Sequence, residues 1–405
     1  MLSPKVFKVG LQYSSNAGTT LGAIGASSSS NAPDPKVSTQ AVINYINAHG
    51  GVAGRRMVPV YNNVDATATP LQESEQACTQ WSQDDHVSLA LPASAVEDNN
   101  DLRACMGKAG IPTIYMNVFS TTLASSFAQS PLWAESIGTS VEGYARTYVA
   151  GLATQGFFTG GKVGVVFYDG GAFKTALQTA MLPALKAAGV VDPATYGASI
   201  SGASDLGAGS SQMSAAVLSF RSKGVDRVLF FEPWAGYFAF LNAAQAQEYH
   251  PRYGLSSQSA PEVAIELGLV NPAQLADARL VSWWPLADVR DYAKYVGPRF
   301  GLCLSIFKKA GLPIATDRTG FGTTLALCES LLMAQDVYSR APAALTGTAF
   351  TTGLETLGGK VLYATRPVGS FGRGKHWGAS VYYAGHFDSA RGCFVLDPAP
   401  HPMKS

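Results

Sequence analysis

The chain has 405 residues, of which 47% are hydrophobic and only 14% charged, and its formal net charge is +1. This length allows one large or two medium-sized domains with real cores, and the near-neutral charge provides no field for nucleic acid. No apolar run approaches the ~20 residues of a membrane helix, and Met1-Leu2-Ser3-Pro4 lacks the basic and apolar regions of a signal peptide. If the native protein is exported, we expect its leader to have been removed.

The N-terminal part of the chain predicts a βαβ unit. Residues Val6–Tyr13 alternate as a strand, Thr39–His49 repeat apolar residues at helical spacing, and Met57–Tyr61 resume as a strand. Gly50 and Gly51 can adopt the positive φ of a helix C-terminus, so we expect the helix to end there.

Strands and helices continue to alternate along most of the chain. Further candidate strands are Val87–Leu91, Pro112–Met116, Lys162–Tyr168, Arg227–Phe231, Leu280–Trp284, Lys360–Tyr363 and Ser380–Ala384. Further candidate helices are Leu71–Trp81, Leu102–Lys108, Val141–Thr154, Lys174–Ala188, Ser211–Lys223, Tyr237–Gln247, Tyr292–Ala310 and Phe321–Tyr338. Two successive βα sets, at about 5–136 and 137–278, predict parallel α/β sheets.

Common catalytic motifs are absent from the sequence. It contains no G-x-S-x-G, H-E-x-x-H or G-x-G-x-x-G motif. Segments 156–163 and 369–376 match G-x-x-x-x-G-K, but Val163 and His376 replace the Ser or Thr of a phosphate-binding loop. The six histidines are scattered rather than spaced to form a metal site. We therefore expect no enzyme activity, no cofactor and no metal.

Hydroxyl, amide and aromatic side chains follow the predicted strands. These loops cover 14–22, 92–95 and 117–121 in the first set, and 169–173 and 232–236 in the second. Ligands of open α/β sheets bind at the carboxyl ends of the strands, where backbone N–H groups converge. We expect a small-molecule site at these loops.

The run INAHGGVAGR, at 46–55, resembles a segment of the type I periplasmic substrate-binding proteins, and 110–112 and 162–169 extend the likeness. Within this class, the segment resembles the leucine/isoleucine/valine-binding proteins. The resemblance implies an α/β fold of two Rossmann-like lobes with parallel sheets, joined by a three-crossover hinge.

The same resemblance implies the lobe boundaries and the biological role. Lobe I would contain 1–136 and 285–364, and lobe II 137–284 and 365–405. Such a protein is a monomeric, non-catalytic receptor that closes on a small molecule and delivers it to the membrane permease of an ABC importer. It is exported to the periplasm or anchored at the cell surface.

The resemblance assigns ligand contacts on lobe I to the loops after the strands. Ser94, together with the N–H of Ala95, lies near the family serine that holds the ligand carboxylate. Ser120 and Thr121 fall where the family presents small and hydroxyl residues to the ligand. Leu21, which replaces a bulkier family residue, and Asn117 complete this part of the predicted site.

On lobe II the resemblance assigns aromatic and polar contacts. Phe173 and Trp234 match aromatic positions near the ligand, although packing in the core is their alternative role, as an N-cap is for a loop serine. Gln258 replaces the acidic residue that pairs with the ligand ammonium. This replacement removes a charge-assisted contact of about 1.5–3 kcal/mol, which Glu232 in the neighbouring loop could supply instead.

Two ligand classes and a second role stay open. The serines and the threonine suit an amino acid, whereas Gln258 and the aromatic residues suit an apolar or aromatic carboxylate without an amino group. The same fold also occurs in ligand-sensing regulatory and receptor domains.

The five cysteines predict two disulfides. Cys78 and Cys105 lie in consecutive helical segments, and the matching family helices often carry a disulfide. Cys303 and Cys328 lie in two later consecutive helical segments and form the second candidate pair, which leaves Cys393 alone in a C-terminal strand. The alternative is five reduced thiols. No C-x-x-C motif supports a zinc ribbon or a redox site.

Overall fold

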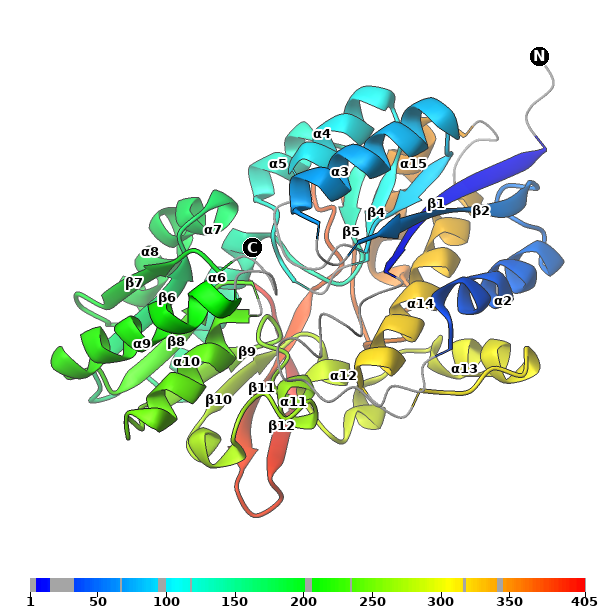
Figure 1. Cartoon of the computed structure of the whole chain (residues 1–405). Helices are drawn as coiled ribbons and strands as arrows, with labels where there is room; N and C mark the ends of the chain where they lie inside the picture. Colours follow the sequence, from blue (N-terminus) through cyan, green and yellow to red (C-terminus); the bar gives the residue numbers. More distant parts are fainter. Residues whose placement is uncertain are drawn as a thin grey trace.

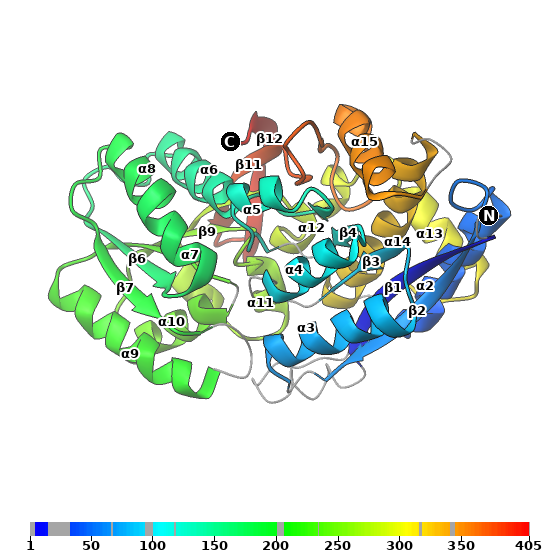
Figure 2. The ribbon, with the colours of Figure 1, turned by 90° about the horizontal axis from the view of Figure 1, so that it is seen from above.

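The structure, a computed structural model, contains two α/β lobes, each with its own sheet (Figures 1 and 2). It describes residues 5–14, 33–65, 68–93, 100–116, 119–200, 206–233, 235–315, 318–340 and 345–404. Within these residues one sheet has the strand order β2-β1-β3-β4-β5 and the other the order β12-β11-β10-β9-β8-β6-β7. The expected fold class is confirmed.

The five-stranded sheet is parallel and covered on both faces. Its strands are β1 (Val6–Ser14), β2 (Arg56–Val64), β3 (Leu89–Leu91), β4 (Thr113–Tyr115) and β5 (Trp133–Glu135). The helices of this lobe are α2 (Pro35–Ala48), α3 (Pro70–Thr79), α4 (Asn100–Ala109), α5 (Ala124–Gln129), α13 (Phe300–Lys309), α14 (Arg318–Ser339) and α15 (Gly347–Leu357). Of these, α3 packs with α4, and α14 packs with α2, α13 and α15.

Successive residues of β1 face opposite sides of the sheet, and the two sides are covered by different helices. The Phe7 ring contacts the Tyr338 ring of α14 edge-on, with their centroids 5.2 Å apart. Gly10 points the other way, towards Trp81 in the π-helical turn (Gln80–Asp84) that follows α3. A Cβ at residue 10 would lie 2.7 Å from the indole, so only glycine lets this ring pack against the strand.

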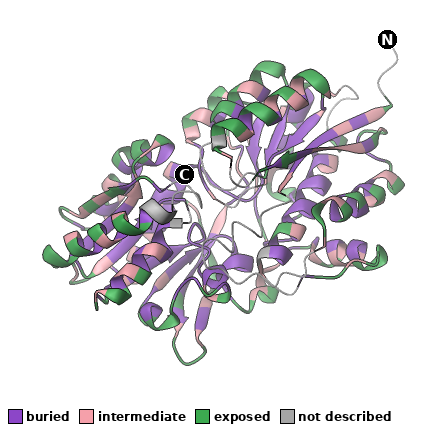
Figure 3. Cartoon of the chain, in the orientation of Figure 1, coloured by how far each residue is buried: buried purple, intermediate pink, exposed green. Residues whose placement is uncertain are grey.

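The seven-stranded sheet is parallel except at one edge. Its parallel strands are β6 (Val163–Tyr168), β7 (Ala194–Ala198), β8 (Arg227–Phe231), β9 (Arg252–Ser256) and β10 (Arg279–Ser282), and the antiparallel strands are β11 (Val381–Asp388) and β12 (Cys393–Pro402). The helices of this lobe are α6 (Val141–Thr154), α7 (Gly171–Ala176), α8 (Leu182–Ala187), α9 (Leu206–Ser222), α10 (Ala235–Ala246) and α11 (Pro261–Glu266). The central strands β8, β9 and β10 are largely buried, whereas the edge strands β7 and β12 and the outer faces of the helices carry exposed residues (Figure 3).

The chain passes between the lobes three times. The first crossing follows β5, the second follows β10 and includes α12 (Pro285–Asp288), and the third lies between α15 and β11. No helix in the described part of the chain is long and apolar enough to span a bilayer.

Both expected disulfides are present. Cys78–Cys105 joins α3 to α4, and Cys303–Cys328 joins α13 to α14, with a Cα–Cα distance of 6.0 Å in each pair. Cys393 is buried and unpaired among the described residues. Each disulfide therefore ties neighbouring helices within one lobe.

Two sequence-based element predictions are wrong. The helix predicted over 292–310 is split, because Pro298 has no N–H to donate, and α13 begins only at Phe300. The strand predicted over 360–363 is absent. Residues Gly358–Lys360 form a 3₁₀ turn instead. The N–H groups of Ala364 and Thr365, which follow the predicted strand, donate to the Glu329 carboxylate rather than to a neighbouring strand.

We expect Gly10→Ala to lower the free energy of unfolding by about 1–3 kcal/mol, because the added methyl group overpacks the Trp81 contact. Urea denaturation measures this change. The control is Gly107→Ala on α4, where an added Cβ meets nothing within 4 Å. This control should leave stability unchanged or raise it by up to about 1 kcal/mol. Equal effects of the two substitutions would contradict the packing argument.

Candidate functional site

The carboxyl ends of the parallel strands gather the candidate residues at two edges. On the seven-stranded sheet, Phe173 follows β6, Glu232 follows β8 and Gln258 follows β9. On the five-stranded sheet, Ser120 and Thr121 follow β4. Because these strands run parallel within each sheet, the residues that follow them lie along one edge.

A hydrogen bond joins the two edges directly. The backbone N–H of Ser120 donates to Oε1 of Gln258 at 2.9 Å, and both residues are fully or almost fully buried. The structure thus brings together two of the residues that the sequence assigned to the site. The carboxyl edges of the two sheets face each other.

The loop after β4 carries buried hydroxyl groups. The Ser120 hydroxyl accepts the N–H of Thr139 in the first crossing at 3.0 Å. The hydroxyls of Thr121 and Thr122 are buried and have no hydrogen-bond partner among the described residues. Both threonines can therefore donate to or accept from a bound molecule. The sequence-based prediction missed Thr122, although it adjoins Thr121.

The side-chain oxygen of Gln258 has a hydrogen-bond partner, whereas its side-chain nitrogen has none among the described residues. The residue is 1% exposed. The backbone N–H of Gln258 donates to the Ser256 hydroxyl at 3.2 Å. The neighbouring Ser257 hydroxyl accepts the N–H of Trp283 at 2.8 Å and that of Trp284 at 2.9 Å. This serine-rich turn fixes where the amide lies.

Glu232 is a buried carboxyl group at the start of α10. Burial raises its pKa to about 8, and the backbone N–H groups of Tyr237 and Gly236 lower that pKa only in part. A Cβ at residue 236 would collide with the carboxyl group, so glycine allows it to lie against the helix. At neutral pH most Glu232 side chains are therefore protonated, and the residue does not supply a fixed negative charge.

Phe173 has the surroundings of a core aromatic residue. It is 3% exposed, and its ring contacts those of Phe231 and Tyr168 edge-on, with centroid distances of 5.3 and 6.1 Å. The other predicted contacts, Leu21, Ser94, Ala95, Asn117 and Trp234, lie outside the described residues.

Three buried ionisable side chains, Arg366, Glu329 and Asp288, hold the crossings, and the sequence analysis missed them. Arg366 donates to the carbonyls of Ser136 and Ile137 at 2.5 and 2.7 Å. Glu329 accepts the N–H groups of Ala364 and Thr365 at 2.7 and 2.9 Å. Glu329 was detectable as a single acidic residue within the apolar run of α14.

Asp288 holds the second crossing. Its Oδ2 accepts the hydroxyls of Ser257 and, at 2.7 Å, Ser282. Burial raises the pKa of Asp288 to about 7, and these two hydroxyls oppose the increase. Ser257, which accepts the N–H groups of Trp283 and Trp284, thus also donates its hydroxyl to Asp288 in the second crossing.

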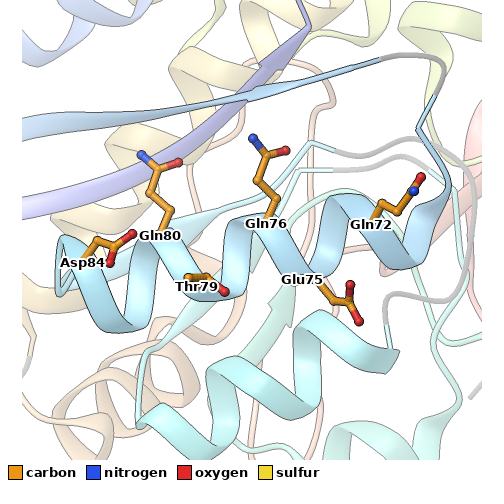
Figure 4. Close-up of a pocket in the computed structure, with 6 residues that line it drawn as sticks. All are labelled: Gln72, Glu75, Gln76, Thr79, Gln80 and Asp84. Carbon is orange, nitrogen blue, oxygen red and sulfur yellow. The ribbon is translucent and has the colours of Figure 1, made fainter.

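A separate shallow groove lies on the surface of α3 and the π-helical turn after it (Figure 4). Its lining residues are Gln72, Glu75, Gln76, Thr79, Gln80 and Asp84. None of the predicted ligand contacts lines this groove. Across the described ranges, no three His, Cys, Asp or Glu side chains cluster closely enough to hold a metal ion.

Comparison with known protein families identifies the class. A family profile described as periplasmic binding protein matches residues 19–301, which is more than two thirds of the chain. The chain therefore belongs to the periplasmic binding protein family, as the sequence analysis predicted. No significant match was found among curated protein sequences.

Solved structures show the same fold. A solute-binding protein of an ABC transporter from Rhodopseudomonas palustris HaA2, in complex with p-hydroxybenzoic acid, has 14% identity and a TM-score of 0.69 over 99% of this chain and 98% of that one. A branched-chain amino acid ABC transporter protein from Thermus thermophilus with bound valine has 14% identity and a TM-score of 0.65 over 99% and 97%. The isoleucine complex of the branched-chain amino acid transporter substrate-binding protein from Streptococcus pneumoniae has 12% identity and a TM-score of 0.62 over 99% and 100%.

The raised pKa of Glu232 predicts a pH-dependent stability. The folded state binds this proton more tightly than the unfolded state, whose pKa is near 4.5. The free energy of unfolding should therefore fall by up to about 1.4 kcal/mol per pH unit as the pH rises from about 4.5 towards 8. Glu232→Gln removes this contribution, so the difference between wild type and variant should change with pH in urea unfolding.

The raised pKa of Asp288 also makes the free energy of unfolding fall as the pH rises. This contribution is the same in wild type and in Glu232→Gln, so it cancels in the difference between them. The matched control is Glu75→Gln, which removes an exposed carboxyl group and should give a curve parallel to wild type. Parallel curves for Glu232→Gln and wild type would contradict the prediction.

Proposed function

We propose that the chain is the extracytoplasmic ligand-binding component of an ABC importer and that it binds a small carboxylate between its lobes. The hydrogen bond from Ser120 to Gln258 carries this proposal, because it brings together the two sheet edges where unpartnered polar groups are buried. The protein is non-catalytic and monomeric, and its partner is the membrane permease. Lobe I contains 1–136 and 285–364, and lobe II 137–284 and 365–405.

The carboxylate is the group that the ligands of the similar structures share. Those structures contain p-hydroxybenzoic acid, valine and isoleucine. Neutral donors such as hydroxyls and backbone N–H groups hold carboxylates without a buried cation. Thr121 and Thr122 supply such donors in the described part of the site. The further proposed contacts are Leu21, Ser94, Ala95, Asn117, Phe173, Glu232 and Trp234.

A thermal-shift screen with small carboxylates tests the proposal. The panel contains L-leucine, L-valine, 4-hydroxybenzoate and 4-methyl-2-oxopentanoate. A ligand at 100 times its Kd raises the free energy of unfolding by about 2.7 kcal/mol, so at least one compound should raise Tm by several degrees. Leucinol and 4-hydroxybenzyl alcohol, which lack the carboxylate, should not. If no carboxylate shifts Tm, or the alcohols shift it equally, the proposed ligand class is wrong.

Thr121→Val tests the site itself. The substitution keeps the shape and removes the hydroxyl, so calorimetry should show roughly tenfold weaker binding of the carboxylate found in the screen. Thr195→Val, at an exposed position of β7, is the matched control and should not change Kd. Unchanged affinity in Thr121→Val would exclude this hydroxyl as a ligand contact.

The genomic neighbourhood tests the transport role. Adjacent permease and ATPase genes are expected for an importer component. An adjacent gene for an RNA-binding antiterminator would instead favour the regulatory role of the same fold.

A further inference from the structure

The Gln258 amide has a fixed direction. A backbone N–H can only donate, so the group of Gln258 that faces Ser120 must be the side-chain oxygen. The NH₂ group of the same amide is therefore turned away from Ser120, and it has no partner among the residues that the structure describes. This orientation follows from the chemistry of the Ser120 contact alone.

Rotation of the amide would leave a buried group unpaired. The Ser120 N–H would lose its acceptor and face an NH₂ group, although the residue is fully buried. A buried donor without an acceptor is destabilising, so the observed orientation is favoured. Gln258 thus offers only a donor to a molecule between the lobes.

Four other described polar residues near the two edges can be compared with Gln258. Thr121 and Thr122 carry neutral hydroxyls. Asp288 Oδ2 already accepts two serine hydroxyls, and burial keeps Glu232 mostly protonated at neutral pH. A protonated amine placed against the Gln258 NH₂ group would therefore face a donor rather than an acceptor.

We propose that Gln258 selects ligands that place a hydrogen-bond acceptor, such as a carboxylate or keto oxygen, against its NH₂ group, and that it disfavours a protonated amine there. This inference rests on the proposed function and names the ligand class of the same site. An ammonium group has only donors, so its placement against the NH₂ group leaves both groups without an acceptor.

Calorimetry with matched pairs of compounds tests the proposal. L-leucine and 4-methyl-2-oxopentanoate share a carbon skeleton, as do L-phenylalanine and phenylpyruvate, and within each pair the amine replaces a keto oxygen. The wild-type protein should bind the better keto acid at least about tenfold more tightly than the matching amino acid.

Gln258→Glu tests the residue. One carboxylate oxygen can still accept the Ser120 N–H, while the second replaces the NH₂ donor, so the preference should shift by at least about tenfold towards the amino acid. Gln178→Glu, an exposed position on the same lobe, adds the same charge and should leave the preference unchanged. If Gln258→Glu does not fold by circular dichroism, Gln258→Met replaces it and should reduce the preference for the keto acid.

The outcomes separate this inference from the proposed function. If wild type prefers the amino acid, or the folded Gln258 variant keeps the wild-type preference, the inference is overturned while carboxylate binding stands. If wild type binds none of these compounds and no carboxylate of the thermal-shift panel, both proposals are overturned.

Discussion

The hydrogen-bonding of the three crossings is the constraint on which the two-lobed arrangement depends. Chain that passes between two cores carries backbone polar groups that water does not reach, and each of these needs a partner. Arg366 binds carbonyls of the first crossing from its position in the third, and Glu329 binds N–H groups of the third from α14. Loss of either charged side chain would leave its partners unpaired in the interior.

The second crossing is hydrogen-bonded to the candidate site. Ser257 bonds Asp288 through its hydroxyl and receives the N–H groups of Trp283 and Trp284, while the next residue, Gln258, contacts the other lobe. One short turn therefore belongs to both the second crossing and the candidate site. A rotation of the lobes about the crossings would change the Ser120 to Gln258 contact directly. Binding and closure are expected to be coupled at this turn.

Local patterns in the sequence predicted much of the fold. The apolar stripe over 141–154 predicted both ends of α6 correctly. Gly50 and Gly51 predicted a helix end within a few residues of Ala48, where α2 ends. Short strands were missed: β5 has three residues, and Gly254 weakens the strand signal of β9. The helix predicted over 292–310 was wrong because its apolar periodicity continues across Pro298, where the structure interrupts the helix.

The site was predictable only in part, because its contacts join distant parts of the chain. Ser120 and Gln258 are 138 positions apart, and the family resemblance assigned both to the site without showing that they bond to each other. Periodicity gives no signal for Arg366, whose partners lie 229 and 230 positions away. Both disulfides join consecutive helices, and the family resemblance also implied the Cys78–Cys105 pair.

Small-angle X-ray scattering tests the central claim, that two hinged lobes close on a small carboxylate, most directly. Scattering is recorded on the full chain alone and with 4-methyl-2-oxopentanoate or 4-hydroxybenzoate at a concentration that calorimetry shows to be saturating. The account predicts a smaller radius of gyration in the saturated sample. An unchanged scattering curve at demonstrated saturation would contradict closure about the three crossings.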